Sequence, residues 1–204
     1  MIIFLNGVSS SGKTSIGRAL QYLCDKPLLL FGIDDFFLMM PKQYLEFGPK
    51  AAKGFPFERR HDQEGTLIHV DQPKEGTFGD KVMKIMPHLV VDMAAEGIDV
   101  IVDEVLLEDE NLRTYVQALK NYTVYFVGVY CSLKIMEERE ILRGDRPVGL
   151  SRDQINRVHG PTRIYDMTVD TTITSAFDCA QHILDFTHHT VHPVGFKKLE
   201  ELLG

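Results

Sequence analysis

A glycine-rich stretch near the start of the chain has the residue types that bind a row of phosphates. The eight residues from Gly7 to Thr14 (GVSSSGKT) match G-x-x-x-x-G-K-[ST] at every fixed position. Glycines let the backbone approach phosphate oxygens, and successive N–H groups at a helix start supply a fixed positive field. In this pattern the lysine reaches the outer phosphates and the final hydroxyl binds Mg²⁺. The alternative is a glycine- and serine-rich turn without a ligand.

The segments on either side of this stretch fit a phosphate-binding loop. Ile2 to Leu5 is an apolar run suited to a buried strand, and Ser15 to Asp25 has apolar residues at helical spacing. The sequence therefore predicts a site for ATP with Mg²⁺. The residues expected to bind this cofactor are Gly7, Ser9, Ser10, Ser11, Gly12, Lys13, Thr14 and Ser15, with Arg139 further along. Lys13 is also a catalytic candidate.

Asp103 is the expected second ligand of the metal. It follows Val100, Ile101 and Val102, and an apolar strand that ends in a carboxylate is typical of the Asp that holds Mg²⁺ with the loop hydroxyl. We therefore expect Thr14 and Asp103 to bind the metal. Glu104 could replace Asp103 or position the waters of the metal, and a structural carboxylate is the remaining alternative.

Asp34 is the expected catalytic base. The apolar run from Pro27 to Ile33 predicts a strand that ends in Asp34 and Asp35. Phosphoryl transfer to an alcohol needs a carboxylate that orients the hydroxyl and accepts its proton. At the tip of a strand beside the strand of the phosphate loop, Asp34 would reach the γ-phosphate. Asp35 is an alternative that could share this role, although alternation along the chain points the two side chains apart. The alternative is that Asp34 caps the next helix.

Three arginines are candidates for a lid over the nucleotide. Arg139, Arg143 and Arg146 are spaced i, i+4, i+7 in a helical segment that breaks near Gly144. In a mobile lid over residues 139–149, Arg143 and Arg146 would neutralise the charge on the transferred phosphoryl group. The alternative is a solvated face on which the arginines pair with neighbouring glutamates.

Residues 36–80 form an irregular insertion that we expect to cover the acceptor. Glycines and prolines interrupt it, although Phe55–Glu58 and Gly65–Val70 could pair as a hairpin. Arg59-Arg60-His61 could bind an anion or be solvated surface. The apolar residues of the insertion could line a pocket for a partly aromatic substrate or form core under a loop; they are Phe36, Phe37, Met39, Met40, Tyr44, Phe47, Phe55 and Phe57.

The remaining elements complete an α/β pattern. Further strands are predicted at 98–107, 123–129 and 167–172, and helices at 80–96, 111–119, 133–143, 151–159 and 175–186. Pro87 predicts a kink or break in its helix, and Ser151 with Gln154 a capping box. The fold class is therefore α/β, a three-layer P-loop kinase-like fold with a mostly parallel five-stranded sheet. We expect one domain over residues 1–204, with a tail at 187–204 that holds one or two helical turns.

Composition limits the partners. The 204 residues carry a net charge of −7, which argues against a nucleic-acid or anionic membrane surface as partner. Cys24, Cys131 and Cys179 lack C-x-x-C pairing, which indicates reduced thiols in a cytoplasmic protein. The oligomeric state stays open, a homo-oligomer included.

The ordered set of motifs resembles one family. Besides the loop, it comprises Phe31-Gly32-Ile33-Asp34, Val102-Asp103-Glu104-Val105, REILRGDRPVG from Arg139, and Val169-Asp170-Thr171-Thr172. With these residues the chain resembles the chloramphenicol phosphotransferase family of small-molecule kinases over residues 2 to 183. The segment from Gly48 to Arg60 is longer and more basic than the family pattern, and the tail after Phe186 has no counterpart in it.

The resemblance implies an ATP-dependent enzyme that phosphorylates a hydroxyl of chloramphenicol or a similar small molecule. It implies that Asp34 is the general base, that Gly7, Gly12, Lys13 and Thr14 form the phosphate loop, and that Arg143 and Arg146 are lid arginines. One alternative is a metabolic kinase that acts on a sugar, nucleoside or nucleotide-sugar hydroxyl. A nucleotide-hydrolysing regulatory switch and a non-catalytic nucleotide-binding module are the others.

Overall fold

The structure is a computed structural model. It describes residues 1–45, 48–56, 59–61, 63, 67–70, 73–144 and 148–203, with the backbone alone at position 68. Three residues singled out in the sequence, Arg146, Phe47 and Phe57, lie outside the described residues.

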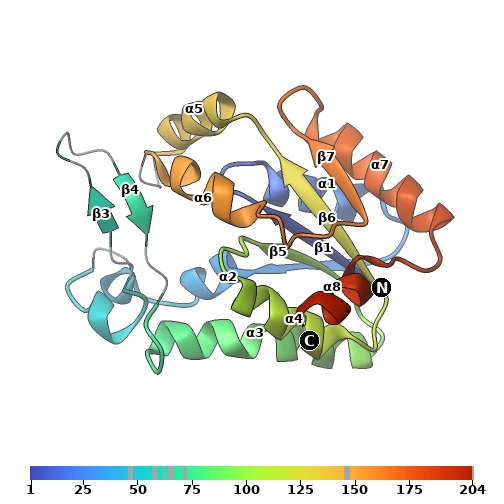
Figure 1. The fold of residues 1–204 in the computed structure, drawn as a ribbon, viewed down its shortest axis with the longest axis horizontal. Helices are drawn as coiled ribbons and strands as arrows, with labels where there is room; N and C mark the ends of the chain where they lie inside the picture. Colours follow the sequence, from blue (N-terminus) through green and yellow to red (C-terminus); the bar gives the residue numbers. More distant parts are fainter. Residues whose placement is uncertain are drawn as a thin grey trace.

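A parallel sheet of five strands forms the centre of the molecule (Figure 1). The five parallel strands confirm the predicted sheet, and their order is β2-β5-β1-β6-β7. The five strands are β1 (Ile2–Gly7), β2 (Leu28–Gly32), β5 (Asp99–Glu104), β6 (Val124–Tyr130) and β7 (Met167–Asp170). The prediction that β2 lies beside the strand of the phosphate loop is wrong, because β5 pairs with both strands and separates them.

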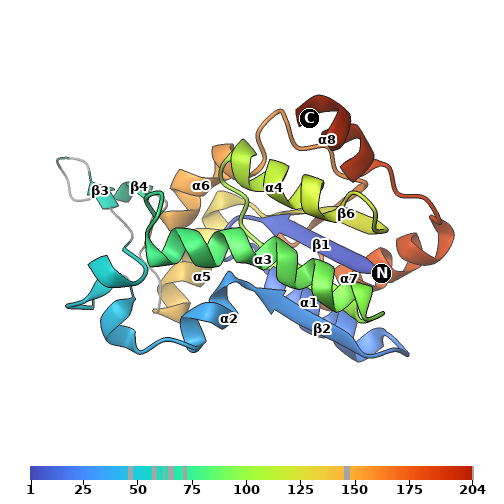
Figure 2. The same cartoon turned by 90° about the horizontal axis from the view of Figure 1, so that it is seen from below.

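Helices cover both faces of this sheet. α3, α4 and α8 lie on one face and α1 and α7 on the other, while α5 and α6 follow the ends of the strands (Figures 1 and 2). Their bounds are α1 (Lys13–Leu23), α2 (Ile33–Leu38), α3 (Phe78–Ala95), α4 (Asp109–Leu119), α5 (Leu133–Arg143), α6 (Leu150–Val158), α7 (Ala176–His189) and α8 (Gly195–Leu203). None of the helices described is long and apolar enough to cross a membrane.

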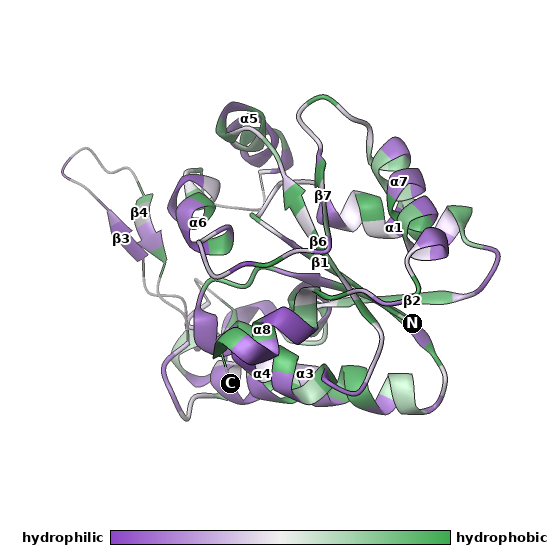
Figure 3. Cartoon of the chain, turned by 45° about the vertical axis from the view of Figure 1, so that its right-hand side comes forward, coloured by the Kyte–Doolittle hydropathy of each residue, from purple (hydrophilic) through white to green (hydrophobic). Residues whose placement is uncertain are grey.

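Alternation along β1 explains why the sheet carries two cores. Ile2 and Phe4 face the core under α3, α4 and α8, whereas Ile3 and Leu5 face the core under α1 and α7. All four side chains are at most 1% exposed. The middle residues of the central strands are accordingly hydrophobic, and the surrounding helices carry both hydrophobic and hydrophilic residues (Figure 3).

The C-terminal tail is part of the first core. α8 is longer than the one or two turns predicted, and it buries Phe196 against Phe4 and Phe126, with ring centroids 5.8 and 5.3 Å apart. The Asp166 carboxylate accepts hydrogen bonds of 2.7 Å from the N–H groups of Val194 and Gly195. These two hydrogen bonds give acceptors to backbone N–H groups at the start of α8. The negative charge of Asp166 also interacts favourably with the helix dipole there.

Pro87 does not break its helix. α3 continues through it from Phe78 to Ala95, and Pro87 is buried together with Met86 and Val90. Proline costs a helix about one hydrogen bond and a steric clash. Burial of the apolar face of α3 in the core offsets this cost, which a local pattern does not show.

The predicted capping box of Ser151 and Gln154 is also wrong. α6 begins at Leu150, and Gly149, with a φ of +95°, is its N-cap. The N–H groups of Gly149 and Ser151 donate instead to the carboxyl oxygens of Glu140, at 2.9 and 2.7 Å. Glu140 is fully buried, so this contact ties the start of α6 to α5.

The insertion contains more structure than the sequence indicates. It starts with α2 and continues through two short 3-10 helices, Lys42–Tyr44 and Ala51–Lys53. A hairpin of β3 (Arg59–His61) and β4 (Leu67–Val70) follows. Of the two strands predicted for it, residues 57–58 and 65–66 lie outside the described residues. The hairpin contacts α6, where the Asp153 carboxylate accepts a bond of 3.1 Å from Val70 N–H and lies 3.0 Å from Nδ1 of His69.

A buried polar network joins the end of β1 to the end of α6. Asn6, which is fully buried, donates through Nδ2 to the Tyr165 hydroxyl and the Val158 carbonyl oxygen, at 2.8 and 3.2 Å. The Tyr165 hydroxyl lies 2.9 Å from Nδ1 of His159, and the His159 ring stacks on Tyr130. Burial lowers the pKa of His159 to about 4, so this imidazole is neutral in the folded protein at neutral pH.

This pKa predicts a pH dependence of stability. In the unfolded chain the pKa of His159 returns to 6.5, so between pH 6.5 and 4 the unfolded chain binds a proton that the folded protein does not. The free energy of unfolding should therefore fall by roughly 2 kcal/mol on this account between pH 7.5 and 5. Urea unfolding at both pH values should show a smaller drop for His159→Phe, and an equal drop would contradict the assignment.

Candidate active site

The phosphate loop has the backbone that its glycines and serines predict. Ser10 and Gly12 have positive φ angles of 62° and 98°, and Ser11 N–H donates to the Val8 carbonyl oxygen at 3.1 Å. A Cβ on Gly7 would lie 2.6 Å from the carbonyl oxygen of Val129 on β6. Only glycine allows this close approach, and the loop therefore sits directly against the sheet.

Hydrogen-bond donors in the loop are available for an anion. α1 begins at Lys13 without a side-chain cap, which leaves the amides of its first turn to another acceptor. The hydroxyl oxygens of Ser10 and Ser11 are buried and have no hydrogen-bond partner among the described residues. Such groups cost about 1–3 kcal/mol each when they stay unpaired. A phosphate group, which offers several acceptor oxygens, fits this set of donors.

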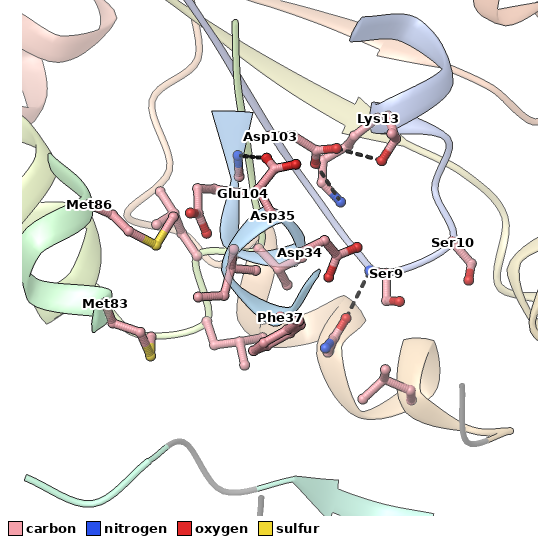
Figure 4. A pocket seen from close by; sticks show the side chains of 18 of the residues that line it. Ser9, Ser10, Lys13, Asp34, Asp35, Phe37, Met83, Met86, Asp103 and Glu104 are labelled. Atoms are coloured by element: carbon pink, nitrogen blue, oxygen red, sulfur yellow. Dashed lines mark hydrogen bonds and ion pairs between the residues drawn. The ribbon is translucent and has the colours of Figure 1, made fainter. Parts of the chain in front are cut away.

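Lys13, Thr14 and Asp103 come together at the carboxyl ends of β1 and β5. The Thr14 hydroxyl donates to Asp103 Oδ2 at 2.6 Å, and Lys13 Nζ lies 3.7 Å from Asp103 Oδ1 (Figure 4). Lys13 Nζ also donates to the Val8 carbonyl oxygen at 3.1 Å. A hydroxyl and a carboxylate are oxygen ligands of the kind Mg²⁺ prefers, so this pair could hold the metal.

Glu104 lies on the opposite side of β5 from Asp103. Its carboxyl group points towards Met86, away from Lys13 (Figure 4), and accepts a hydrogen bond of 3.1 Å from the Tyr115 hydroxyl. Burial, together with the nearby Asp103 carboxylate, raises the pKa of Glu104 to about 8. Because side chains alternate along a strand, Glu104 and Asp103 lie on opposite faces of β5, and Glu104 is poorly placed to replace Asp103 on the metal.

Asp34 lies in the first turn of α2 and not at the strand tip predicted. It is exposed and lines the same cavity as Lys13 and Asp103. Gly32 is the N-cap of α2, and its N–H donates to Asp35 Oδ2 at 2.8 Å. Asp35 therefore makes the capping contact that the sequence offered as the alternative role of Asp34.

Arg139 of α5 donates a hydrogen bond to the backbone of the phosphate loop. Its guanidinium group donates to the Ser10 carbonyl oxygen at 3.2 Å, and to the hydroxyl and carbonyl oxygens of Thr171, each at 3.1 Å. The Thr171 hydroxyl in turn donates to the Ser11 carbonyl oxygen at 2.6 Å. The alternative in which Arg139 pairs with glutamates on a solvated face is wrong. The guanidinium N–H groups of Arg139 donate instead to Ser10 of the loop and to Thr171.

Of the other two arginines, the structure describes Arg143. It is the last residue of α5, is exposed and lines the cavity. Arg146 belongs to the part of the chain that is not described, so its lid role stays a prediction.

A single cavity of about 1690 Å³ extends from the phosphate loop to the insertion. At the loop end it is lined by Lys13, Thr14 and Asp103. Apolar side chains of the insertion and of α3 line the far end; they are Phe37, Leu45, Phe55, Met83 and Met86. The phosphate-loop residues, Asp34 and these apolar side chains therefore line one space.

The aromatic residues of the insertion divide between cavity and core. Phe37 and Phe55 line the cavity and pack edge to face at 4.9 Å, although Phe55 is fully buried. Phe36 packs on Phe31, and Met39 is exposed. Part of the set thus lines the cavity and part packs as core, while the aromatic substrate stays a prediction. Arg59 also lines the cavity, whereas the neighbouring Arg60 and His61 are exposed.

Two residues of the site escape the sequence analysis as functional candidates. Gln154 of α6 lines the cavity, and its Oε1 accepts a hydrogen bond of 2.8 Å from Ser9 N–H. Thr171 binds Arg139 and the loop, and its only signal is a place in the VDTT segment. No spacing rule connects Gln154 to a loop that lies 145 positions earlier in the chain.

Comparison with known proteins identifies related sequences. A family model described as chloramphenicol phosphotransferase-like protein matches residues 1–188. The protein named "Putative O-phosphotransferase Rv2636", from Mycobacterium tuberculosis, is 28% identical over 200 residues, which cover 98% of this chain and 88% of the relative.

Solved structures share the fold at low sequence identity. The Mycobacterium tuberculosis APS kinase CysC, in complex with AMPPNP and APS, has a TM-score of 0.59 at 15% identity, over 92% of this chain and 96% of its own. The Deinococcus radiodurans tunicamycin resistance protein has a TM-score of 0.60 at 18% identity, over 91% and 94%. Shikimate kinase from Acinetobacter baumannii has a TM-score of 0.55 at 14% identity, over 92% and 93%. The chain thus has the fold of P-loop kinases.

The contacts of Arg139 predict the effect of a conservative change. Arg139→Lys keeps the charge but cannot donate to Ser10 and Thr171 together. We expect Mg²⁺·ATP to bind about 10-fold more weakly, which is the loss of about one net hydrogen bond. Calorimetric titration measures this affinity. Arg152→Lys, in an exposed ion pair with Glu137, is the control and should change it less than about twofold. If both changes weakened Mg²⁺·ATP binding equally, Arg139 would not be the residue that holds the phosphate loop in its binding conformation.

Proposed function

Since the chain belongs to the chloramphenicol phosphotransferase-like family, we propose that it transfers the γ-phosphate of ATP to a hydroxyl of chloramphenicol or a similar small molecule. The observation that carries this proposal is the continuous cavity. It holds the phosphate loop, the Thr14–Asp103 pair, the Asp34 carboxylate and an apolar acceptor end in one space. A hydrolytic switch would not need an acceptor end, and a binding module would not need a base.

In this proposal the loop and its neighbours hold the nucleotide. Lys13 and the amides at the start of α1 bind the triphosphate, and the unpaired hydroxyls of Ser10 and Ser11 donate to its oxygens. Thr14 and Asp103 are the protein ligands of Mg²⁺, which would neutralise charge on the phosphates. Arg139 positions the loop through the Ser10 carbonyl oxygen.

Asp34 activates the acceptor in the proposed reaction. Its carboxylate orients the hydroxyl of the acceptor and takes the proton as the oxygen bonds to phosphorus. The exposure of Asp34 to the cavity supports this role, and so does the separate use of Asp35 in capping α2. Arg143 and Arg146 would close over the transferring group and neutralise its charge.

The lining of the acceptor end supports a partly apolar alcohol. Phe37, Met83 and Met86 point into this part of the cavity (Figure 4). Aromatic and methionine side chains give a large, adaptable apolar surface that suits a drug-like molecule. Glu104 and Asn111 also line it, which supports an acceptor that carries further polar groups, so a sugar or nucleoside is the second candidate class.

The cytoplasm is the proposed compartment. ATP is available there, and the three cysteines, all described, are unpaired, as expected in a reducing environment.

The proposal is tested by ATP consumption with and without chloramphenicol at fixed Mg²⁺, followed by mass spectrometry of the drug. A gain of one phosphate on chloramphenicol is the expected result. A phosphorylated sugar or nucleoside from a parallel screen would move the acceptor to the second class. No phosphorylated product from any alcohol, with steady ATP hydrolysis, would contradict the proposal.

Replacing the base should separate turnover from binding. Asp34→Asn cannot accept the proton, so we expect kcat to fall about 10²–10⁴-fold, while the affinity for Mg²⁺·ATP changes less than about threefold. Steady-state kinetics and calorimetry measure the two quantities. Asp35→Asn is the matched control, because its amide oxygen can still accept from Gly32 N–H, and its kcat should stay near that of the unchanged protein. Normal turnover of Asp34→Asn would refute the base assignment.

A further inference from the structure

Gln154 is a buried amide at the wall of the phosphate loop. Its side chain lines the cavity and is 7% exposed, and its Oε1 accepts from Ser9 N–H at 2.8 Å. Glutamine is mostly exposed in folded proteins. A buried one therefore needs partners for both ends of its amide, and Ser9 satisfies only the oxygen end.

The contact with Ser9 fixes which way the amide faces. A backbone N–H can only donate, so the atom of Gln154 that meets Ser9 must be the oxygen. The two N–H donors on Nε2 therefore point away from Ser9. Among the described residues no hydrogen bond engages Nε2, and Gln154 lines the cavity, so these donors are available to a bound molecule.

The helix that carries Gln154 is held on two sides. Glu140 of α5 accepts from the N–H groups of Gly149 and Ser151 at the start of α6. Asp153, the residue before Gln154, binds the acceptor-covering hairpin through Val70 N–H at 3.1 Å. The amide is thus fixed relative to the phosphate loop and to the cover of the acceptor, as a reacting site requires.

The position of Lys13 shows which phosphates of a bound nucleotide would lie beside Gln154. The ammonium group of this lysine reaches the outer phosphates in the loop pattern. Lys13 Nζ lies 3.1 Å from the carbonyl oxygen of Val8, the residue directly before Ser9. The outer phosphates are therefore expected beside Val8 and Ser9, which is where the amide of Gln154 lies.

We propose that Gln154 is a catalytic residue whose Nε2 donates to an oxygen of the transferring phosphoryl group while Ser9 N–H holds its Oε1. This inference rests on the proposed function. The bond from phosphorus to the ADP oxygen breaks, the bond to the acceptor oxygen forms, the proton goes to Asp34, and Gln154 is unchanged. Since charge spreads over the outer oxygens of phosphorus in the transition state, a fixed donor there accelerates transfer.

Gln154→Glu removes the donor end of the amide and adds a negative charge beside the phosphates. Glutamate keeps an oxygen for Ser9 N–H and the same side-chain length, but it replaces Nε2 by an acceptor oxygen. Gln154→Met, of similar length, removes both ends and is the second variant in case the glutamate disturbs folding, which melting temperatures report. Asn156→Asp makes the same amide-to-acid change on an exposed position of α6 and is the control.

The measurements are kcat and the Mg²⁺-dependent affinities for ADP and for a non-hydrolysable ATP analogue. For Gln154→Glu and Gln154→Met we expect kcat to fall about 100-fold and the analogue to bind about 10-fold more weakly. The affinity for ADP should change less than about twofold, and Asn156→Asp should match the unchanged protein. A contact that only anchors the loop would instead weaken ADP and the analogue equally in Gln154→Met, whose side chain is uncharged. That result would overturn the proposal.

The two proposals fail in different ways. If the unchanged protein phosphorylates no alcohol but Gln154→Met still loses affinity for the analogue and not for ADP, the proposed function is wrong and the phosphate contact of Gln154 is supported. If the unchanged protein phosphorylates an alcohol and Gln154→Glu does so at the same rate, the role of Gln154 falls and the proposed function stands.

Discussion

A hydrogen bond of 2.6 Å between the Thr14 hydroxyl and the Asp103 carboxylate joins the two strand ends on which the site depends. It forms because β1 and β5 pair in parallel with Leu5 opposite Asp103, so both strands deliver their following residues to the same edge of the sheet. Alternation then sends Glu104 to the other face of β5. One strand end thereby supplies the phosphate side and the acceptor side of the cavity, which explains why both lie in a single space.

The phosphate loop is held in place by residues that lie far away in the chain. Its positive φ angle at Ser10 is costly for a residue with a side chain, and such strain persists only where the surroundings enforce it. Arg139 holds the Ser10 carbonyl oxygen and Gln154 the Ser9 N–H, from α5 and α6 respectively. Because Glu140 links these two helices, the loop is supported by one connected unit. We infer that this support keeps the donors of the loop directed at the phosphates before the nucleotide arrives.

The sequence predicts the features that depend on local pattern and fails where distant contacts decide. Apolar runs such as Ile2 to Leu5 predict all five strands of the main sheet. The two residues predicted to bind the metal, Thr14 and Asp103, lie within hydrogen-bond distance of each other. Tertiary burial overrides the local effect of Pro87 in α3. The carboxyl group of Glu140 replaces the capping box, and α2 moves Asp34 from a strand tip to a helix. The partners of Arg139 and Gln154 are set by folding and have no local signature.

The central claim is that the cavity passes a phosphoryl group from ATP to an alcohol and not to water. A single-turnover experiment with γ-labelled ATP, Mg²⁺ and excess enzyme tests it most directly, with chloramphenicol or the acceptor found by screening. The account predicts that the label appears on the alcohol in one phase, with little inorganic phosphate. Label that appears as inorganic phosphate at the same rate with or without the alcohol would contradict it.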